Sequence, residues 1–485
     1  MTYQAVIGLE IHVQLKTKSK IFSGASTSFG NEPNTQACAV DLGLPGVLPV
    51  LNKEAVMMAI KFGLAVNAKI QNNSIFARKN YFYPDLPKGY QISQFEIPIV
   101  SEGSLKIKVG DDFKEIRITR AHLEEDAGKS IHDMFSSDSA IDLNRAGTPL
   151  IEIVSEPDMT SADEAIEYLK TIHTLVKYLD ICDGNMQEGS FRCDANVSLK
   201  KSTDTKLGIR AEIKNINSFK FVEQAINYEI ERQSEILDSG GKVIQETRLY
   251  DPTKNQTRSM RSKEEANDYR YFPDPDLLPV YIDEQDIKSI KSTMPELPEE
   301  KRIRFMKDYS LSEYDTSVLI SDKNLSSYFE SVIQSKKLEP KNVANWILTD
   351  LLGLANKNKI AINELPITPD RLEQLLIFVN DGIISNKQGK VVLEKMWGTS
   401  KTPREIIDSE GISQESNENE INKLVDKVLE NHYKSVEEYM KGKDKLFGFF
   451  IGEVMRESKG KANPKIVNKI LRERLKNDNE FNKKD

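Results

Sequence analysis

Residues 7–16 alternate strictly between apolar and polar positions, which is the pattern of a β-strand with one buried face. The odd positions from Ile7 to Leu15 are all aliphatic, and the even positions carry glycine or polar residues. Successive side chains of a strand point to opposite faces of the sheet. The pattern therefore predicts Glu10 and His12 side by side on the face away from the core.

Two further segments, residues 191–199 and 209–214, show the same alternation, and the strand predicted at residues 115–123 ends in three acidic residues. In the second of them, Ile209, Ala211 and Ile213 are predicted to point inward. The polar residues predicted on the outer faces, or directly after the last strand, are Arg192, Asp194, Asn196, Ser198, Arg210, Glu212, Lys214, Glu124, Glu125 and Asp126.

Each of these segments by itself could be an ordinary strand with one solvent-exposed face. Four segments that carry carboxylates beside cations or an imidazole suggest a functional site. Carboxylates gathered on one sheet face repel each other unless a divalent metal, and the phosphates it bridges, offset their charge. Mg²⁺ prefers oxygen ligands, whereas His12 suits a softer divalent ion better. The sequence predicts a metal and nucleotide site here, with Arg192, Lys214 or Lys79 available to neutralise a phosphoryl group.

Helical periodicity marks two segments of the N-terminal half and most of the C-terminal half. Ser161 to Glu164 form a capping-box pattern that opens one helix, and Gly240 and Gly241 end another. From Met294 onward strand patterns largely disappear, and residues 411–422 are predicted to form a polar linker. We therefore predict an α+β protein with a mainly antiparallel sheet domain at 1–292, a helical domain at 293–408 and a helical tail at 409–485.

One nucleotide-binding motif is excluded. The segment Asp126-Ala-Gly-Lys-Ser130 resembles the end of a P-loop, but the first glycine of that motif would fall at position 123, which is leucine. Three acidic residues precede the segment and would repel the phosphates that a P-loop holds. A nucleotide is therefore predicted to be bound in another way.

Composition and charge narrow the class of protein. Apolar residues make up 39% and charged residues 29% of the chain, and no apolar run approaches the roughly 18 residues of a membrane span. The three cysteines lack metal-site spacing, and the N-terminus lacks a leader pattern, so a cytoplasmic protein is expected. The net charge is −8, yet residues 441–476 hold eleven basic and four acidic residues, which suggests an RNA contact there.

Longer motifs, in the same order, carry a family resemblance. They are Val6–Leu15, Arg78–Asp85 with Tyr90–Gln94, His122–Lys129, Asp142–Leu150 with Ile151–Asp158, Gly189–Asn196, Asp268–Pro273 and, in the tail, Lys459–Pro464. Together they closely resemble the B subunit of the tRNA-dependent (aspartyl/glutamyl-tRNA) amidotransferases, over essentially the whole chain.

This resemblance implies a sheet similar to those of glutamine synthetase and the guanido kinases, and a heterotrimer with an amidase subunit and a small C subunit. The implied activity is an ATP- and Mg²⁺-dependent carbon–nitrogen ligase that amidates glutamate or aspartate mischarged on tRNA, with glutamine as the amido donor. The resemblance and the strand pattern together predict four metal ligands, Glu10, His12, Glu124 and Glu125. The other predicted site residues are Arg192, Asp194, Glu212 and Lys214 for catalysis, Lys79, Tyr81 and Arg210 for nucleotide binding, and Lys459, Lys461, Lys465, Lys469 and Arg472 for tRNA.

Two other functions remain open. A non-catalytic protein that presents tRNA to a partner enzyme would be expected to have a basic sheet face, not an acidic one. A freestanding kinase of a small carboxylate would need neither the helical region nor the basic tail. The sequence does not indicate whether the substrate is glutamyl-tRNA, aspartyl-tRNA or both.

Overall fold

The structure is a computed structural model that describes residues 3–110, 112–131, 138–262, 269–411, 418–458 and 462–481. The chain divides into two compact units, Met1–Pro298 and Glu299–Asp485. Among the described residues, every strand lies in the first unit, and the second unit is helical. The predicted α+β class, with a large N-terminal sheet and a helical C-terminal region, is therefore confirmed. No described helix is long and apolar enough to cross a membrane.

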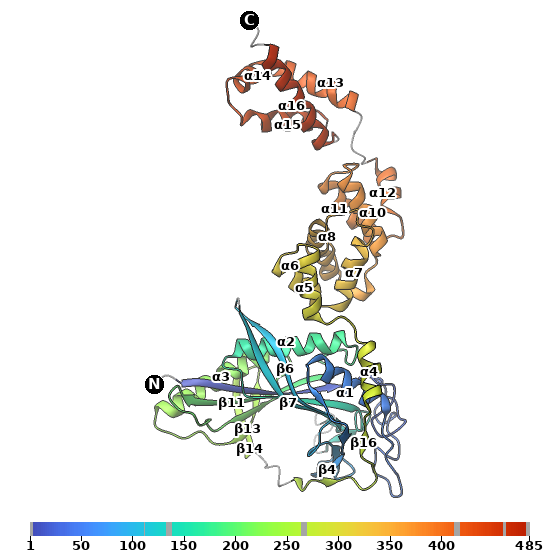
Figure 1. Cartoon of the computed structure of the whole chain (residues 1–485), viewed down its shortest axis with the longest axis vertical. Helices are drawn as coiled ribbons and strands as arrows, with labels where there is room; N and C mark the ends of the chain where they lie inside the picture. The colour runs from blue at the N-terminus through green and yellow to red at the C-terminus, as the bar shows by residue number, and fades with distance from the viewer. Residues whose placement is uncertain are drawn as a thin grey trace. The chain divides into compact units, whose positions relative to one another are not determined.

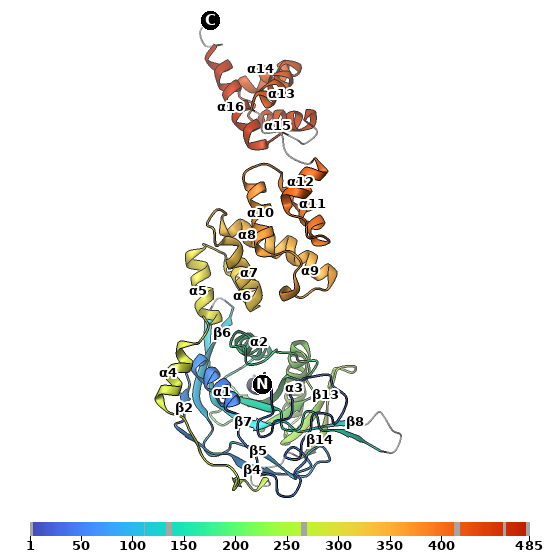
Figure 2. The same ribbon diagram turned by 90° about the vertical axis from the view of Figure 1, so that its right-hand side faces the viewer.

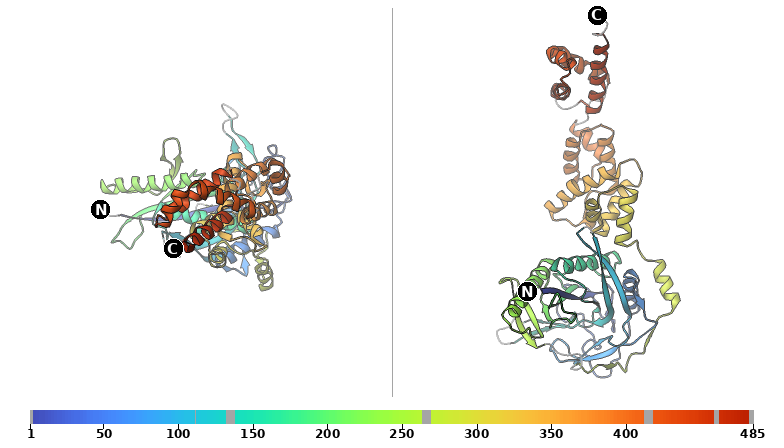
Figure 3. Two further views of the ribbon diagram at one scale, coloured as in Figure 1. Left: turned by 90° about the horizontal axis from the view of Figure 1, so that it is seen from above. Right: turned by 60° about the vertical axis from the view of Figure 1, so that its left-hand side comes forward.

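A large sheet forms the frame of the first unit (Figures 1 and 3). Its strands run in the spatial order β14-β13-β12-β11-β1-β10-β7-β5-β4-β15, with β6 paired to β7 and β2 paired to β6. All described pairs of this sheet are antiparallel except β12 with β13. The strands are β1 (Tyr3–Gln14), β2 (Lys69–Ile70), β4 (Ala77–Asn80), β5 (Tyr90–Ser93), β6 (Val100–Val109), β7 (Asp112–Glu125), β10 (Pro149–Ser155), β11 (Phe191–Lys201), β12 (Ala211–Lys214), β13 (Glu246–Asp251), β14 (Gln256–Ser262) and β15 (Phe272–Pro273).

Two small pairs stand apart from this sheet, namely β3 (Asn73–Ser74) with β16 (Val280–Tyr281) and β8 (Lys129–Ile131) with β9 (Ala140–Asp142). Figure 2 shows β8 projecting from the sheet. The segment that resembles a P-loop thus continues into a strand, and the N–H of Gly128 donates to the carbonyl of Asp85 (2.9 Å). A P-loop requires a helix after the glycine-rich turn, so the structure agrees with the exclusion of this motif.

Helices cover one face of the sheet and bury its apolar side chains. They are α1 (Lys53–Ala65), α2 (Ala162–Tyr178) and α3 (Phe219–Asp238), and α4 (Glu284–Ser292) packs on α1. The odd residues of β1 from Ile7 to Val13 share one core with these helices, as the alternation predicts. Ser161 caps α2 by accepting the N–H of Glu164 (3.2 Å), and Gly240, with a φ of +78°, follows α3 as predicted.

One predicted inward position is wrong. Ile209 is 50% exposed, whereas Ala211 and Ile213 are fully buried. The strand begins only at Ala211, so the alternation before that residue has no partner strand to place it against the core.

The second unit contains two separate hydrophobic cores. The first core belongs to α5 (Pro298–Asp308), α6 (Glu313–Ile320), α7 (Lys323–Ile333), α8 (Pro340–Asn345), a π-helical turn (Trp346–Leu351), α9 (Leu352–Asn358), a 3₁₀ turn (Ile362–Glu364), α10 (Pro369–Asn380), α11 (Asn386–Trp397) and α12 (Pro403–Glu410). The second core belongs to α13 (Glu418–Asn431), α14 (Tyr433–Met440), α15 (Leu446–Glu457) and α16 (Pro464–Phe481). Because α13 already begins at Glu418, the linker predicted to reach residue 422 ends earlier.

Candidate functional site

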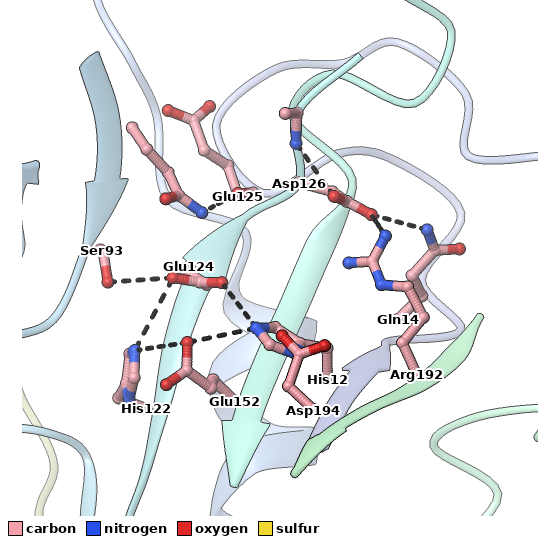
Figure 4. Close-up of polar contacts among 12 residues, drawn as sticks. His12, Gln14, Ser93, His122, Glu124, Glu125, Asp126, Glu152, Arg192 and Asp194 are labelled. Atoms are coloured by element: carbon pink, nitrogen blue, oxygen red, sulfur yellow. Dashed lines mark hydrogen bonds and ion pairs between the residues drawn. The ribbon is translucent and has the colours of Figure 1, made fainter. Parts of the chain in front are cut away.

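A row of ionisable side chains crosses four adjacent strands on the sheet face opposite the helices. In the order β7, β10, β1, β11, the register pairs His122 with Glu152, Glu152 with His12, and His12 with Arg192. Residues directly opposite each other on neighbouring strands share a face, so the pairing alone brings these side chains together. Figure 4 shows His122, Glu152 and His12 converging with Glu124, whereas Arg192 points toward Asp126.

Two imidazoles alternate with two carboxylates in this row. The Nε2 atom of His12 lies 3.3 Å from Oε2 of Glu152 and 4.0 Å from Oε1 of Glu124. The Nε2 atom of His122 lies 3.7 Å from Glu124 and 3.8 Å from Glu152. The hydroxyl of Ser93, on β5, donates to Oε2 of Glu124 (3.2 Å).

Charge compensation explains how these carboxylates tolerate burial. Burial by itself would raise the pKa of Glu152, but His122, His12 and the nearby Lys79 outweigh it and hold that pKa well below its usual range. Burial opposes the charged form of His12, yet the hydrogen bond and charge of Glu152 raise the pKa of the imidazole above its ordinary value. The hydrogen bond and charge of neighbouring groups, His12 among them, therefore stabilise the ionised form of Glu152.

The same residues suit a divalent cation. One ligand atom each from His12, Glu124 and Glu152 lie within 4.8 Å of one another, and no other such group occurs in the described parts of the chain. Two carboxylate oxygens and one imidazole nitrogen form an ordinary donor set for a divalent ion, with room for water or phosphate oxygens. A cation bound at Nε2 of His12 would exclude a proton from that nitrogen, so metal binding and protonation of His12 would compete.

Asp126 lies beside the row and binds three side chains, Gln14, Arg192 and Arg145. Its Oδ2 atom accepts the side-chain amide of Gln14 (2.8 Å) and lies 3.1 Å from the guanidinium of Arg192 and 3.6 Å from that of Arg145. Burial raises the pKa of Asp126, but Arg192 and Arg145 outweigh it, so the net shift is downward. Arg192 is therefore held by a buried, ionised carboxylate.

A third group lies on β1, β11 and β12, where Glu10 is paired with Asp194 and Asn196 with Glu212. The ammonium of Lys214 lies 2.5 Å from Asp194 and 3.2 Å from Glu212. The side-chain amide of Asn196 donates to Glu10 (2.9 Å), and Thr247 donates to Glu212 (2.9 Å). One ammonium and the hydrogen bonds of Asn196 and Thr247 thus engage these carboxylates.

Glu125 points away from the row, because it follows Glu124 on the strand and so faces the other side. Its carboxylate pairs with Lys88 and accepts the N–H of Ile92 (2.8 Å). Of the four predicted metal ligands, the structure therefore brings His12 and Glu124 together and leaves Glu10 and Glu125 outside that group. Whether Glu10 or Glu125 binds metal stays a prediction.

Two of the three predicted nucleotide-binding residues, Lys79 and Tyr81, lie close to each other, and the third lies on another strand end. Lys79 is on β4, with its ammonium 4.9 Å from the ring centre of Tyr269 and 5.7 Å from that of Tyr81. The hydroxyl of Tyr81 donates to Gln91 (3.3 Å). Arg210 is exposed just before β12.

The predicted tRNA-binding residues belong to the tail. Lys465, Lys469 and Arg472 are exposed on α16, and their spacing of four and three residues puts them on one face of the helix. The guanidinium of Arg472 stands 5.3 Å above the ring of Phe447. Lys459 and Lys461 lie outside the described residues.

The sequence prediction missed His122 and Glu152 as members of the row. The sequence contains a feature that points to each of them. His122 precedes Glu124 by two residues and so shares its strand face, and Glu152 is a charged residue within the apolar run Leu150–Val154. The alternation could place each on the polar face, but it could not show which strands are neighbours.

Comparison with known proteins agrees with this architecture. Residues 5–288 match the family described as the GatB/GatE catalytic domain, and residues 327–475 match the family described as the GatB domain. Because the first match covers more than half of the chain, the protein belongs to this catalytic-domain family. Within it, the chain is a member of the family of aspartyl/glutamyl-tRNA amidotransferase B subunits, as its relatives show.

Three of these relatives carry the same name, that of the B subunit of the aspartyl/glutamyl-tRNA(Asn/Gln) amidotransferase. The protein of Alkalilimnicola ehrlichii is 58% identical over 476 residues, that of Thioalkalivibrio sulfidiphilus 59% over 476, and that of Coxiella burnetii strain RSA 493 57% over 477. Each alignment covers 98% of this chain and 100% of the relative.

Proposed function

We propose that this chain is the subunit that activates glutamate mischarged on tRNA-Gln, aspartate mischarged on tRNA-Asn, or both, for amidation. The side-chain carboxylate of such a residue is a poor electrophile, because attack by ammonia would have to expel an oxide. Transfer of the terminal phosphoryl group of ATP onto the carboxylate gives an acyl phosphate, whose leaving group is stable phosphate. The site would catalyse this transfer and the attack of ammonia that follows it.

The observation that carries the proposal is the row of alternating carboxylates and imidazoles in a chain of this family. His12, Glu124 and Glu152 would hold a divalent cation, and Mg²⁺ is the ion we expect. A bound Mg²⁺ would neutralise phosphate charge and polarise the phosphoryl oxygens. The neighbouring Ser93 fixes one oxygen of Glu124 by donating its hydroxyl hydrogen, which orients that carboxylate.

Positioning and charge neutralisation are the main tasks in phosphoryl transfer, since the attacking carboxylate is already a nucleophile. Lys79, Tyr81 and Arg210 are the residues proposed to contact the nucleotide. Asp126 fixes Arg192, and Asp194 and Glu212 fix Lys214, so these two cations are rigidly placed at the edge of the site.

Ammonia must reach the site unprotonated, because bulk water would convert most of it to ammonium. We propose that an amidase subunit releases it from glutamine, within a heterotrimer that also includes a small C subunit. The acidic sheet face is unsuited to the phosphate backbone of tRNA, so we assign tRNA recognition to the basic tail.

The test is release of ADP by the reconstituted complex. We expect ADP to form when ATP, Mg²⁺ and glutamyl- or aspartyl-tRNA are present, and not with uncharged tRNA or free amino acid. ADP release from free glutamate would instead indicate a kinase of small carboxylates. No ADP release, with tRNA binding intact, would indicate a non-catalytic tRNA-presenting subunit.

A further inference from the structure

Three cations were predicted from the sequence to neutralise a phosphoryl group, namely Lys79, Arg192 and Lys214, and they differ in what they already bind. Arg192 is engaged by the buried carboxylate of Asp126 at 3.1 Å. Lys214 is engaged by Asp194 at 2.5 Å and Glu212 at 3.2 Å. Each already pairs with carboxylates of this chain, which offset its charge.

Lys79 differs from Arg192 and Lys214 because its ammonium is not engaged by a carboxylate of the described chain. Within the part of the chain that the structure describes, its ammonium makes no hydrogen bond or ion pair, so its three N–H donors lack protein acceptors. The ammonium instead faces the rings of Tyr269 at 4.9 Å and Tyr81 at 5.7 Å. Aromatic faces attract a cation but accept no conventional hydrogen bond from it.

The position of this ammonium is fixed by the strands that carry it. Lys79 is paired with Gln91 on β5, and β5 meets β7 where Ser93 is paired with Glu124. The charged or titratable groups that act on Lys79 are Glu124, Glu152, Tyr271 and Tyr81. Burial opposes the charged form of Lys79, but Glu124 and the other groups outweigh it and raise the pKa of the amine. The ammonium is therefore charged, close to two carboxylates of the row, and not in contact with either.

We infer that Lys79 is the residue that binds the terminal phosphoryl group of ATP, whereas Arg192 and Lys214 act as counter-ions that position Asp126, Asp194 and Glu212. A phosphoryl group carries several acceptor oxygens, so it can contact a cation held by the row and still accept hydrogen bonds from Lys79. The inference rests on the proposed function, because it assigns a role within the same site.

The experiment compares nucleotide binding by the full-length chain and its variants in the presence of Mg²⁺, by isothermal titration with ATP and with ADP. Loss of a charge-assisted hydrogen bond costs about ten-fold to a hundred-fold in affinity. We therefore expect Lys79→Met to weaken ATP binding by that factor and to change ADP binding less than about three-fold. Lys79→Arg, which keeps the charge and the donors, is expected to recover most of the affinity.

Lys16→Met is the matched control, since Lys16 is an exposed lysine that follows β1 and pairs with Asp180. It is expected to bind both nucleotides like the unmodified chain. The melting temperature of Lys79→Met is measured alongside to show that the variant folds, because the substitution removes a charge that favours ionised Glu152. If that variant does not fold, Lys79→Gln replaces it in the same comparison.

Equal affinity of Lys79→Met and the unmodified chain for ATP would overturn the inference. Equal losses for ATP and ADP would also overturn it, since Lys79 would then contact another part of the nucleotide. Failure of the unmodified chain and of its reconstituted complex to bind ATP would instead overturn the proposed function, and the inference with it.

Discussion

At the scale of single residues, Glu152 occupies the centre of the site. It lies in the middle of β10 between His12 and His122, and Glu124 approaches the same two imidazoles from β7. Removing its charge would leave the imidazoles with one carboxylate to share. Glu152 is therefore expected to contribute more to cation binding than any carboxylate outside the row.

Glu152→Gln should lower the affinity for Mn²⁺, used as a probe for Mg²⁺, by about ten-fold or more, because it removes one charged ligand. Paramagnetic resonance of free Mn²⁺ measures this directly on the full-length chain. Glu125→Gln serves for comparison, since the carboxylate of Glu125 is bound by Lys88 and Ile92. We expect its effect on Mn²⁺ affinity to be smaller. Equal effects of the two substitutions would show that Glu125 is a ligand, as the sequence predicted.

Tyr168 provides a second prediction at this scale. Its hydroxyl is buried and has no hydrogen-bond partner among the described residues. Burying an unpaired hydroxyl costs free energy, so Tyr168→Phe should raise the free energy of unfolding by about 1 kcal/mol. Tyr250→Phe is the matched control, because that hydroxyl has acceptors within reach on Asn255 (2.7 Å) and Gln224 (3.2 Å), and its loss should destabilise.

Both tryptophans, Trp346 and Trp397, lie in the second unit, so their fluorescence does not report on Tyr168. Urea unfolding of the first unit is better followed by the near-ultraviolet circular dichroism of its tyrosines. A destabilised Tyr168→Phe variant would indicate that the hydroxyl has a partner after all.

At the scale of elements, the start of α2 depends on Glu164. Its carboxylate lies 2.7 Å from the ammonium of Lys114 on β7 and accepts the N–H of Thr160 at 2.7 Å. Burial raises the pKa of Glu164, but Lys114 and Thr160 outweigh it, and the net shift is downward. One side chain thus joins the helix N-terminus to the sheet.

The sign of the pH dependence follows from this shift. A carboxylate whose pKa is lower in the folded state stabilises the fold above its unfolded pKa of about 4.3, and this contribution is lost as the pH falls through the folded value. Glu164→Gln should therefore cost about 1–2 kcal/mol at pH 7. The difference from the unmodified chain should stay constant down to about pH 5 and shrink below about pH 4.

Urea unfolding of both chains between pH 7 and pH 3.5 measures this difference. Glu167→Gln, one turn further along α2, is the control and should show no such pH dependence. A difference for Glu164→Gln that persists unchanged at pH 3.5 would rule out the charge of Glu164 as its cause.

At the scale of the whole molecule, the tail has a hydrophobic core of its own, built from α13 to α16. No described residue beyond Ile407 belongs to the hydrophobic core of the preceding helices, and the buried link between the two is a hydrogen bond from Asn463 to the carbonyl of Gly382 (3.1 Å). Removal of residues 412–485 therefore leaves that core and the sheet domain complete. This separation allows tRNA binding to be tested without disturbing the catalytic site.

The truncated chain is expected to bind tRNA more weakly and with a flatter dependence on salt. If about three phosphates are neutralised by the tail, the slope of log affinity against log salt should fall in magnitude by about 2 to 3. The triple variant Lys465→Gln, Lys469→Gln and Arg472→Gln should reproduce most of this change, since these side chains share one exposed face of α16. Glutamine hydrolysis by the complex should persist in both. Unchanged affinity and slope would show that the basic run is a solvated helix face.

The sequence by itself determined the periodic features of this protein. The alternation in β1 and β11 predicted their buried residues, and Ser161 predicted the start of α2, because both depend on neighbours along the chain. The same local pattern placed His12, Asp194 and Glu212 on polar strand faces.

Only the tertiary structure decided which of those side chains meet. Strand order and register result from pairing between segments that are distant in the chain, more than a hundred residues apart for β1 with β10 and with β11, and alternation shows a face but not a neighbour. The pairing of β10 between β7 and β1 brought Glu152 into the site, and Lys88 drew Glu125 away from it. Ile209 shows the same limit, because an apolar residue is buried only where another strand or helix covers it.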